Sequence, residues 1–184
     1  MSPTGLTVLI GTTKGAFLLS GGPNRSGWDI SGPFCDGWPI NHIIGDPATG
    51  TLWAGGGGDW HGAGVWRSGD GGATWDVIRL TSGTMDDWAA NDPDFARMIN
   101  WSDAPLPYGS DFTQIWSLEQ AHGTLYAGTK PAQLLASTDG GTTWDKINGL
   151  SDHDSADSWN PGAAGLVLHS IVTDPANPKK LWRA

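Results

Sequence analysis

The sequence predicts an all-β protein built from repeated four-stranded antiparallel units. Three observations support this prediction: an eight-residue phrase occurs twice, the residues before each copy also repeat, and the composition suits turns between strands. Gly contributes 28 of the 184 residues, and Glu occurs once, at Glu119, whereas Asp is abundant. Because Asp and Gly favour turns while Glu favours helices, this composition indicates a turn-rich β domain.

The repeated phrase has the pattern S-x-D-x-G-x-T-W and occupies residues 68–75 and 137–144. Each copy lies between a short apolar run and a β-prone run, which predicts a hairpin turn. The Ser hydroxyl and Asp carboxylate can hydrogen-bond the turn backbone, and Gly supplies a positive φ. We therefore expect the phrase to be structural, with a Trp starting each outgoing strand. Its residues are Ser68, Asp70, Gly72, Thr74, Trp75, Ser137, Asp139, Gly141, Thr143 and Trp144.

The repeat extends beyond this phrase. The run T-L-W-A-G at 51–55 corresponds to T-L-Y-A-G at 124–128, and I-I-G-D-P at 43–47 corresponds to I-V-T-D-P at 171–175. One complete unit then has four short strands, expected at 42–45, 51–55, 64–68 and 74–79. Four antiparallel strands per repeat are typical of a β-propeller blade.

The repeat predicts that residues 1–184 form one truncated propeller domain. The predicted parts are three strands of a first blade in 1–31, a second blade at 42–79, a long crossover loop at 80–114, a third blade at 115–147 and the start of a fourth at 168–184. About three and a half blades do not close a ring, so we expect a fragment of a larger propeller. The crossover is a candidate functional loop because of its length, with one short helical turn near 93–99.

Charge and composition exclude several classes of function. The formal net charge is −9, and the ten Lys and Arg residues are spread along the chain, which argues against nucleic-acid binding. No long apolar run suggests a membrane span, and residues 1–22 lack the features of an export signal, so a soluble cytoplasmic protein is expected. Cys35 is the only Cys, which leaves no internal disulfide and favours a small buried side chain.

Strand order separates two rims of such a propeller. The phrase turns lie on one rim, and the other is expected to collect 12–14, 32–40, 56–63, 80–114, 129–132 and 148–166. This second rim holds five Trp residues: Trp38, Trp60, Trp88, Trp101 and Trp159. Trp beside Asp, Asn and His suits saccharide binding, and it equally suits loops that pack on their own core. The glycine run at 55–58 is interpreted as a flexible turn on this rim.

Candidate site residues follow from this partition. The ligand-binding candidates are Lys14, Trp60, His61, Trp88, Trp101, Lys130, His153, Trp159 and His169. The candidates for catalytic carboxylates are Asp59, Asp86, Asp87 and Asp154. His42 and His169 begin the first strands of two units and could face the propeller axis, but no metal-ligand spacing accompanies them, so hydrogen-bonded histidines are expected and no metal or cofactor is predicted.

The S-x-D-x-G-x-T-W phrase is the Asp box, and the chain resembles the BNR-repeat, sialidase-like β-propellers. The stretches at 10–15, 31–33, 125–129, 159–162 and 165–171 are similar to a bacterial group often labelled exo-α-sialidase or glycosyl hydrolase. The resemblance covers most of the chain except 80–114, and it implies a propeller of six or seven blades. Sialidases of this kind use three Arg, a Tyr nucleophile assisted by Glu, an Asp acid/base and an Arg-Ile-Pro segment. No Arg-Ile-Pro occurs here, and the only Tyr residues are Tyr108 and Tyr126.

Three functions remain open at this point. The first is a non-catalytic scaffold that binds a saccharide, another small polar ligand or a protein partner on the Trp-rich rim. The second is a glycoside hydrolase, either sialidase-like or of the xyloglucanase type with two Asp as acid and base. The third comprises other chemistry or a purely structural role. The sequence favours the binding scaffold, without nucleic-acid or membrane partners.

Overall fold

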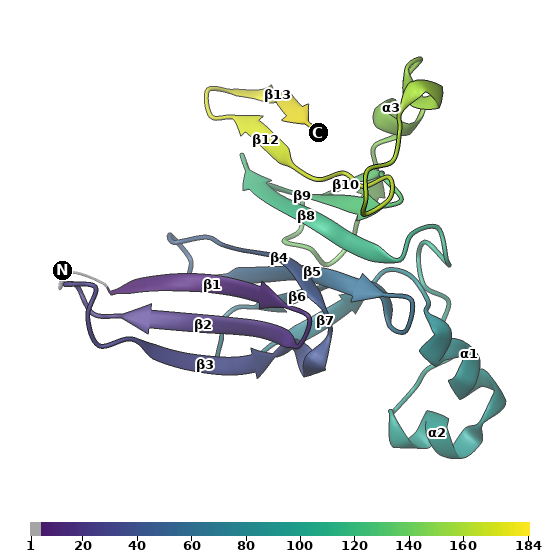
Figure 1. Ribbon diagram of the computed structural model, residues 1–184, viewed down its shortest axis with the longest axis horizontal. Helices are drawn as coiled ribbons and strands as arrows, with labels where there is room; N and C mark the ends of the chain where they lie inside the picture. The colour runs from purple at the N-terminus through teal and green to yellow at the C-terminus, as the bar shows by residue number, and fades with distance from the viewer. Residues whose placement is uncertain (1–4) are drawn as a thin grey trace.

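The structure is a computed structural model that describes residues 5–184 as three antiparallel sheets with short helices in the connections (Figure 1). Residues 1–4 of the predicted first unit, 1–31, lie outside the described residues. The strands are β1 Leu6–Thr12, β2 Gly15–Gly21, β3 Asp29–Phe34, β4 Ile40–Gly45, β5 Leu52–Gly58, β6 Gly62–Ser68, β7 Asp76–Arg79, β8 Gln114–Ala121, β9 Thr124–Lys130, β10 Leu134–Ser137, β11 Asp145–Lys146, β12 Ile171–Asp174 and β13 Asn177–Arg183. The helices are η1 Cys35–Gly37, α1 Thr84–Asn91, α2 Pro93–Met98, α3 Asn148–Ser151 and η2 Ala156–Ser158.

Strand pairing follows the chain order. Strands β1, β2 and β3 form one sheet, and β12 and β13 form a hairpin. The curled eight-stranded sheet between them consists of two consecutive antiparallel sections, β4–β7 and β8–β11. Gly57 with Gln114 is the one strand-pairing contact between the two sections within the described residues. The prediction of a mainly β, antiparallel fold is therefore confirmed.

The apolar core lies in three layers between successive groups of strands. One cluster joins β1–β3 to β4–β7, a second joins β4–β7 to β8–β11, and a third joins β8–β11 to the β12–β13 hairpin. Neighbouring residues of one strand pack into different core clusters on opposite faces of the sheet, as Trp53 and Ala54 of β5 do. This alternation follows from the two-residue period of a strand, and it means that the middle sections are buried on both faces.

Both copies of the S-x-D-x-G-x-T-W phrase form hairpin turns, between β6 and β7 and between β10 and β11. In the second copy, Ser137 Oγ donates to Asp139 Oδ1 (2.8 Å) and accepts from the Gly141 N–H (2.8 Å). The Asp139 carboxylate accepts from the backbone N–H (2.9 Å) and hydroxyl (2.6 Å) of Thr143. The Trp144 indole N–H donates to the Gly141 carbonyl (2.9 Å). All of these hydrogen bonds join residues within the phrase, so the phrase stabilises its own turn.

The first copy makes the same set of bonds, through Ser68, Asp70, Gly72, Thr74 and Trp75. These bonds lower the pKa of Asp70 to about 2, with the Thr74 N–H and hydroxyl as the largest causes and Ser68 next. The Trp53 indole of β5 donates to the Gly140 carbonyl (2.9 Å), so the second turn packs against the section that carries the first.

Three expectations from the sequence are wrong in detail. The glycine run at 55–58 belongs to strand β5, and the turn that follows it lies at 59–61. Close packing explains Gly56, since a Cβ there would lie 1.9 Å from the Pro39 carbonyl oxygen. Crossover 80–114 contains two helices, α1 and α2, where one helical turn was predicted. Trp38, predicted on the ligand-binding rim, is buried in the core.

Candidate functional site

Backbone hydrogen bonds join the 80–114 crossover to the β5–β6 turn and the segment before β12 to strand β9. At the start of α1, the Thr84 and Met85 N–H groups donate to the carbonyls of Asp59 (2.8 Å) and Trp60 (2.9 Å). Before β12, the Leu168 N–H donates to the Thr129 carbonyl (3.0 Å). Figure 1 shows α1, α2 and α3 on the same side of the molecule, on the right of the view. Two cavities lie among the crossover segments and the strands next to them.

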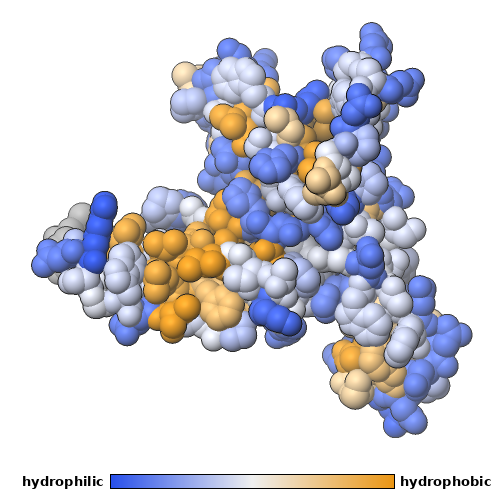
Figure 2. Space-filling view, viewed as in Figure 1, coloured by the Kyte–Doolittle hydropathy of each residue, from blue (hydrophilic) through white to orange (hydrophobic). Residues whose placement is uncertain are grey.

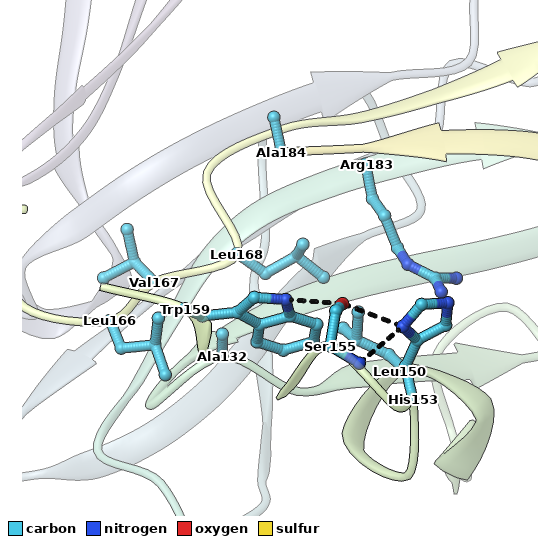
Figure 3. Close-up of a pocket in the computed structure, with 10 residues that line it drawn as sticks. All are labelled: Ala132, Leu150, His153, Ser155, Trp159, Leu166, Val167, Leu168, Arg183 and Ala184. Carbon is cyan, nitrogen blue, oxygen red and sulfur yellow. Dashed lines mark hydrogen bonds between the residues drawn. The ribbon is translucent and has the colours of Figure 1, made fainter. Parts of the chain in front are cut away.

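The larger cavity, here called the Trp159 cavity, has a volume of about 380 Å³ (Figure 3). Its walls come from the β9–β10 turn, from the 148–166 crossover and from the end of β13. They are mainly apolar, with three polar side chains, and the lining residues are Ala132, Leu150, His153, Ser155, Trp159, Leu166, Val167, Leu168, Arg183 and Ala184. An apolar cavity with a few polar groups, in this range of volume, is typical of a small-molecule site.

A chain of hydrogen bonds orients the polar wall of the Trp159 cavity. The Trp159 indole N–H donates to Ser155 Oγ (3.0 Å), and Ser155 Oγ lies 2.8 Å from His153 Nδ1. The Ser155 backbone N–H also donates to His153 Nδ1 (3.2 Å). Because an indole nitrogen can only donate, the Ser155 hydroxyl hydrogen is free to donate to His153 Nδ1. This arrangement assigns the ring proton to His153 Nε2, which is left as a donor.

The second cavity, here called the Trp101 cavity, has a volume of about 280 Å³ and lies under the 80–114 crossover. Its central group is Asp86, whose carboxylate forms a bidentate ion pair with Arg79 (2.9 and 2.5 Å). The same carboxylate accepts from the Trp101 indole N–H (2.9 Å) and from the Gly83 N–H (2.8 Å). Two predicted site residues, Asp86 and Trp101, are therefore in direct contact. Together with Arg79, they fasten the 80–114 crossover to the end of β7.

Burial acts to raise the pKa of Asp86, but hydrogen bonds from Arg79, Gly83 and Trp101 and the guanidinium charge lower it overall. Asp86 therefore stays ionised near neutral pH. A general acid needs a carboxyl group whose pKa is raised, so this environment does not suit Asp86 to that role. Asp59, Asp87 and Asp154 are exposed to solvent.

A third group of predicted residues forms an aromatic cluster. The Trp60 and Trp88 rings meet edge to face with centroids 5.4 Å apart, and Phe95 lies 6.3 and 6.2 Å from them. His61, from the same turn as Trp60, instead stacks on buried Trp38 (4.6 Å). Burial and the nearby Arg79 charge lower the pKa of His61. The sequence did not single out Phe95, because its position is fixed by the unforeseen pairing of α1 with α2.

The remaining predicted residues lie elsewhere. His42, in β4, accepts a hydrogen bond at Nδ1 from the Leu118 N–H of β8 (2.8 Å), and burial lowers its pKa, with Glu119 and His169 as opposing nearby charges. Lys130 Nζ lies 5.9 Å from the centroid of Trp116, a residue of β8 that the sequence reasoning did not select. Lys14 is exposed in the β1–β2 turn and lines neither cavity.

The structure brings His153 and Trp159 into one cavity, and it adds Ser155 and Arg183, which the sequence did not indicate. Arg183 reaches the cavity through pairing of β13 with β12, a contact between distant parts of the chain. Among residues 5–184, no cluster of three or more His, Cys, Asp or Glu side chains is arranged to hold a metal ion. Within the same residues, no helix is long and apolar enough to cross a membrane.

The chain matches no protein-family model, and no curated protein is significantly similar to it. The Asp-box resemblance therefore stays a prediction from the two S-x-D-x-G-x-T-W phrases. A function for the chain has to follow from the geometry of its own residues.

Proposed function

We propose that the chain forms blades of an Asp-box β-propeller whose rim, opposite the boxes, binds a saccharide or similar polar ligand in the Trp159 cavity. The antiparallel four-stranded sections and the face-to-face layers between them support the propeller. One observation supports the ligand site above all others. The hydrogen-bonded chain of Trp159, Ser155 and His153 orients an indole ring and a ring N–H donor in the wall of one cavity, which Arg183 also lines (Figure 3).

The chemistry of these groups selects a class of ligand. A saccharide has an apolar C–H face that packs on an indole ring, and it has hydroxyl or carboxylate oxygens that accept hydrogen bonds. His153 Nε2–H and the Arg183 guanidinium are donors suited to such oxygens. The Trp159 indole N–H is already occupied by Ser155. The indole therefore offers the ligand its ring and not a further polar group.

Binding is proposed rather than hydrolysis, because most glycosidases use two carboxyl groups flanking the scissile bond, and sialidases use a Tyr nucleophile with an Asp acid/base. No Tyr side chain lines the Trp159 cavity among the described residues. No Asp or Glu side chain lines the Trp159 cavity in the described part of the chain. The Trp101 cavity holds Asp86, which is engaged by Arg79, together with Asp103. The alternative of a glycoside hydrolase gains no specific support from this arrangement.

The test is a glycan array followed by calorimetric titration of the best glycan with the full chain. His153→Asn retains an acceptor near the position of Nδ1 but removes the Nε2–H donor. We expect it to weaken binding by about 0.5–1.5 kcal/mol while the fold is kept. Trp159→Ala removes the ring and should weaken binding by about 1–2 kcal/mol, roughly tenfold.

Trp28→Ala provides a matched control, since Trp28 is an exposed Trp that lines neither cavity. This variant should bind glycan as the unmodified chain does. Because Trp159 also packs against the third core cluster, its variant must first be shown to be folded by circular dichroism. Unchanged affinity in both the His153 and Trp159 variants would contradict the proposed site.

A further inference from the structure

The helical lobe of α1 and α2, residues 84–98, presents large apolar side chains to solvent. Trp88 is 59% exposed and Met98 is 74% exposed, and Trp60 beneath the lobe is 39% exposed. Figure 2 shows the lobe at the lower right, as an apolar patch bordered by hydrophilic residues and projecting from the body of the protein. A contiguous exposed patch of this kind, rimmed by polar groups, is a feature of interaction sites.

The patch is held in place from three directions. The edge-to-face contacts of Trp60, Trp88 and Phe95 tie the β5–β6 turn to both helices. Asp92 caps α2 by accepting from the N–H groups of Asp94 (2.9 Å) and Phe95 (3.1 Å). The Arg79–Asp86 ion pair anchors the first turn of α1 to the end of β7. A partner would therefore meet an ordered aromatic surface, which lowers the entropy lost on binding.

The charge around the patch is mainly negative. Residues 84–98 contain four Asp and a single basic residue, Arg97, which pairs with Asp94. Asp87 and Asp92 are exposed in the same lobe, and the exposed Asp59 directly precedes Trp60 in the chain. A cation over an indole face is attracted by the ring electrons, and nearby carboxylates add to that attraction.

We infer that the α1–α2 lobe is a docking surface for a Lys- or Arg-rich segment of a partner protein, whose cationic side chains lie on Trp88 between the carboxylates. A second copy of this chain does not fit, because its net charge is −9 and it would bring further carboxylates to an acidic surface. This inference does not depend on the Trp159 cavity, since neither Trp60 nor Trp88 lines it.

The test measures fluorescence anisotropy of a labelled peptide of alternating Arg and Ser with the full chain, at low and at physiological ionic strength. A Glu–Ser peptide of equal length serves as the comparison. Trp88→Ala should weaken binding of the Arg–Ser peptide roughly two- to fivefold, as expected for one exposed cation–π contact. Asp87→Lys should weaken it at least as much at low salt, and its effect should shrink as salt screens the charge.

Two control variants separate docking from a general attraction of the peptide to an acidic protein. Trp182→Ala removes another exposed Trp (49%) far along the chain, in β13, and Asp29→Lys reverses an exposed charge in β3. Both should leave the affinity unchanged. If Trp88→Ala disturbs the lobe, Trp88→Phe and the exposed Asp87→Lys still test the surface. The inference is overturned if the Arg–Ser peptide does not bind, if the Glu–Ser peptide binds equally, or if the controls lose as much affinity as the lobe variants.

Discussion

Removal of one buried hydroxyl from an Asp box should destabilise the whole fold. Ser137 is only 2% exposed, and its Oγ accepts from the Gly141 N–H while it donates to Asp139. Ser137→Ala leaves the buried Gly141 N–H without its acceptor. A buried donor left unsatisfied costs about 1–3 kcal/mol. We therefore expect the free energy of unfolding to fall by about 2 kcal/mol, which lowers Tm by roughly 4–8 °C for a chain of this size.

Differential scanning calorimetry of Ser137→Ala, Ser68→Ala and Ser110→Ala measures this effect directly. Ser68 occupies the same place in the first box and is 1% exposed, so its variant should lose a similar amount of stability. Ser110 is exposed in the 80–114 crossover and serves as the matched control. If both box variants melt within about 1 °C of the Ser110 variant, the hydroxyl bonds do not stabilise the turns and the reasoning fails.

Two further predictions concern ionisation. Hydrogen bonds from Thr143 and Ser137 lower the pKa of Asp139, as bonds from Thr74 and Ser68 lower that of Asp70 to about 2. Because these folded-state pKa values lie below the ordinary value of 3.8, the carboxylates stabilise the fold above that pH and lose this contribution as the pH falls toward 2. Tm measured against pH should drop across this window, and the drop should be shallower in the double variant Asp70→Asn with Asp139→Asn; an identical profile would count against it. Burial raises the pKa of Cys35 to about 12, so an aromatic disulfide reagent should label it slowly at neutral pH in the native protein and fully in guanidinium. Rapid labelling of the folded chain would refute that expectation.

Parts of the fold that depend on short-range chemistry could be predicted from the sequence. The eight residues of each Asp box supply both partners of nearly every turn hydrogen bond, so their pattern alone predicts a hairpin. The glycine run at 55–58 could not be interpreted in that way. Position 56 of β5 requires Gly because its backbone passes the Pro39 carbonyl closely, and Pro39 directly precedes β4, the strand paired with β5. The sequence around Gly56 does not indicate this contact with Pro39.

Helix α1 shows a different limit of sequence reasoning. Its signals are present: Asp86 and Asp87 lie in the first turn, and Asp92 with Pro93 ends the helix and starts the next. Within a segment rich in Asp, Pro and Gly, these signals were outweighed by loop-like composition. Whether the segment forms a helix or a loop depends on a contact that the sequence does not reveal. The Asp86 carboxylate accepts from the Gly83 N–H at the helix start and from Arg79 on β7. The helix is thus specified by a contact with the sheet as well as by its own residues.

Loop tryptophans show how far composition can predict a binding site. Trp38 and Trp60 lie in segments assigned to one rim, yet their rings have opposite environments. Trp38 is 6% exposed, because the η1 turn directs it onto His61 and Trp66, where it packs at 4.6 and 5.7 Å. Trp60 joins a cluster whose outer ring, Trp88, remains open to solvent. A count of loop Trp residues therefore overstates the ligand-binding surface. Only rings that the core leaves accessible, such as Trp88 on the lobe and Trp159 in its cavity, can contact a ligand without unfolding part of the protein.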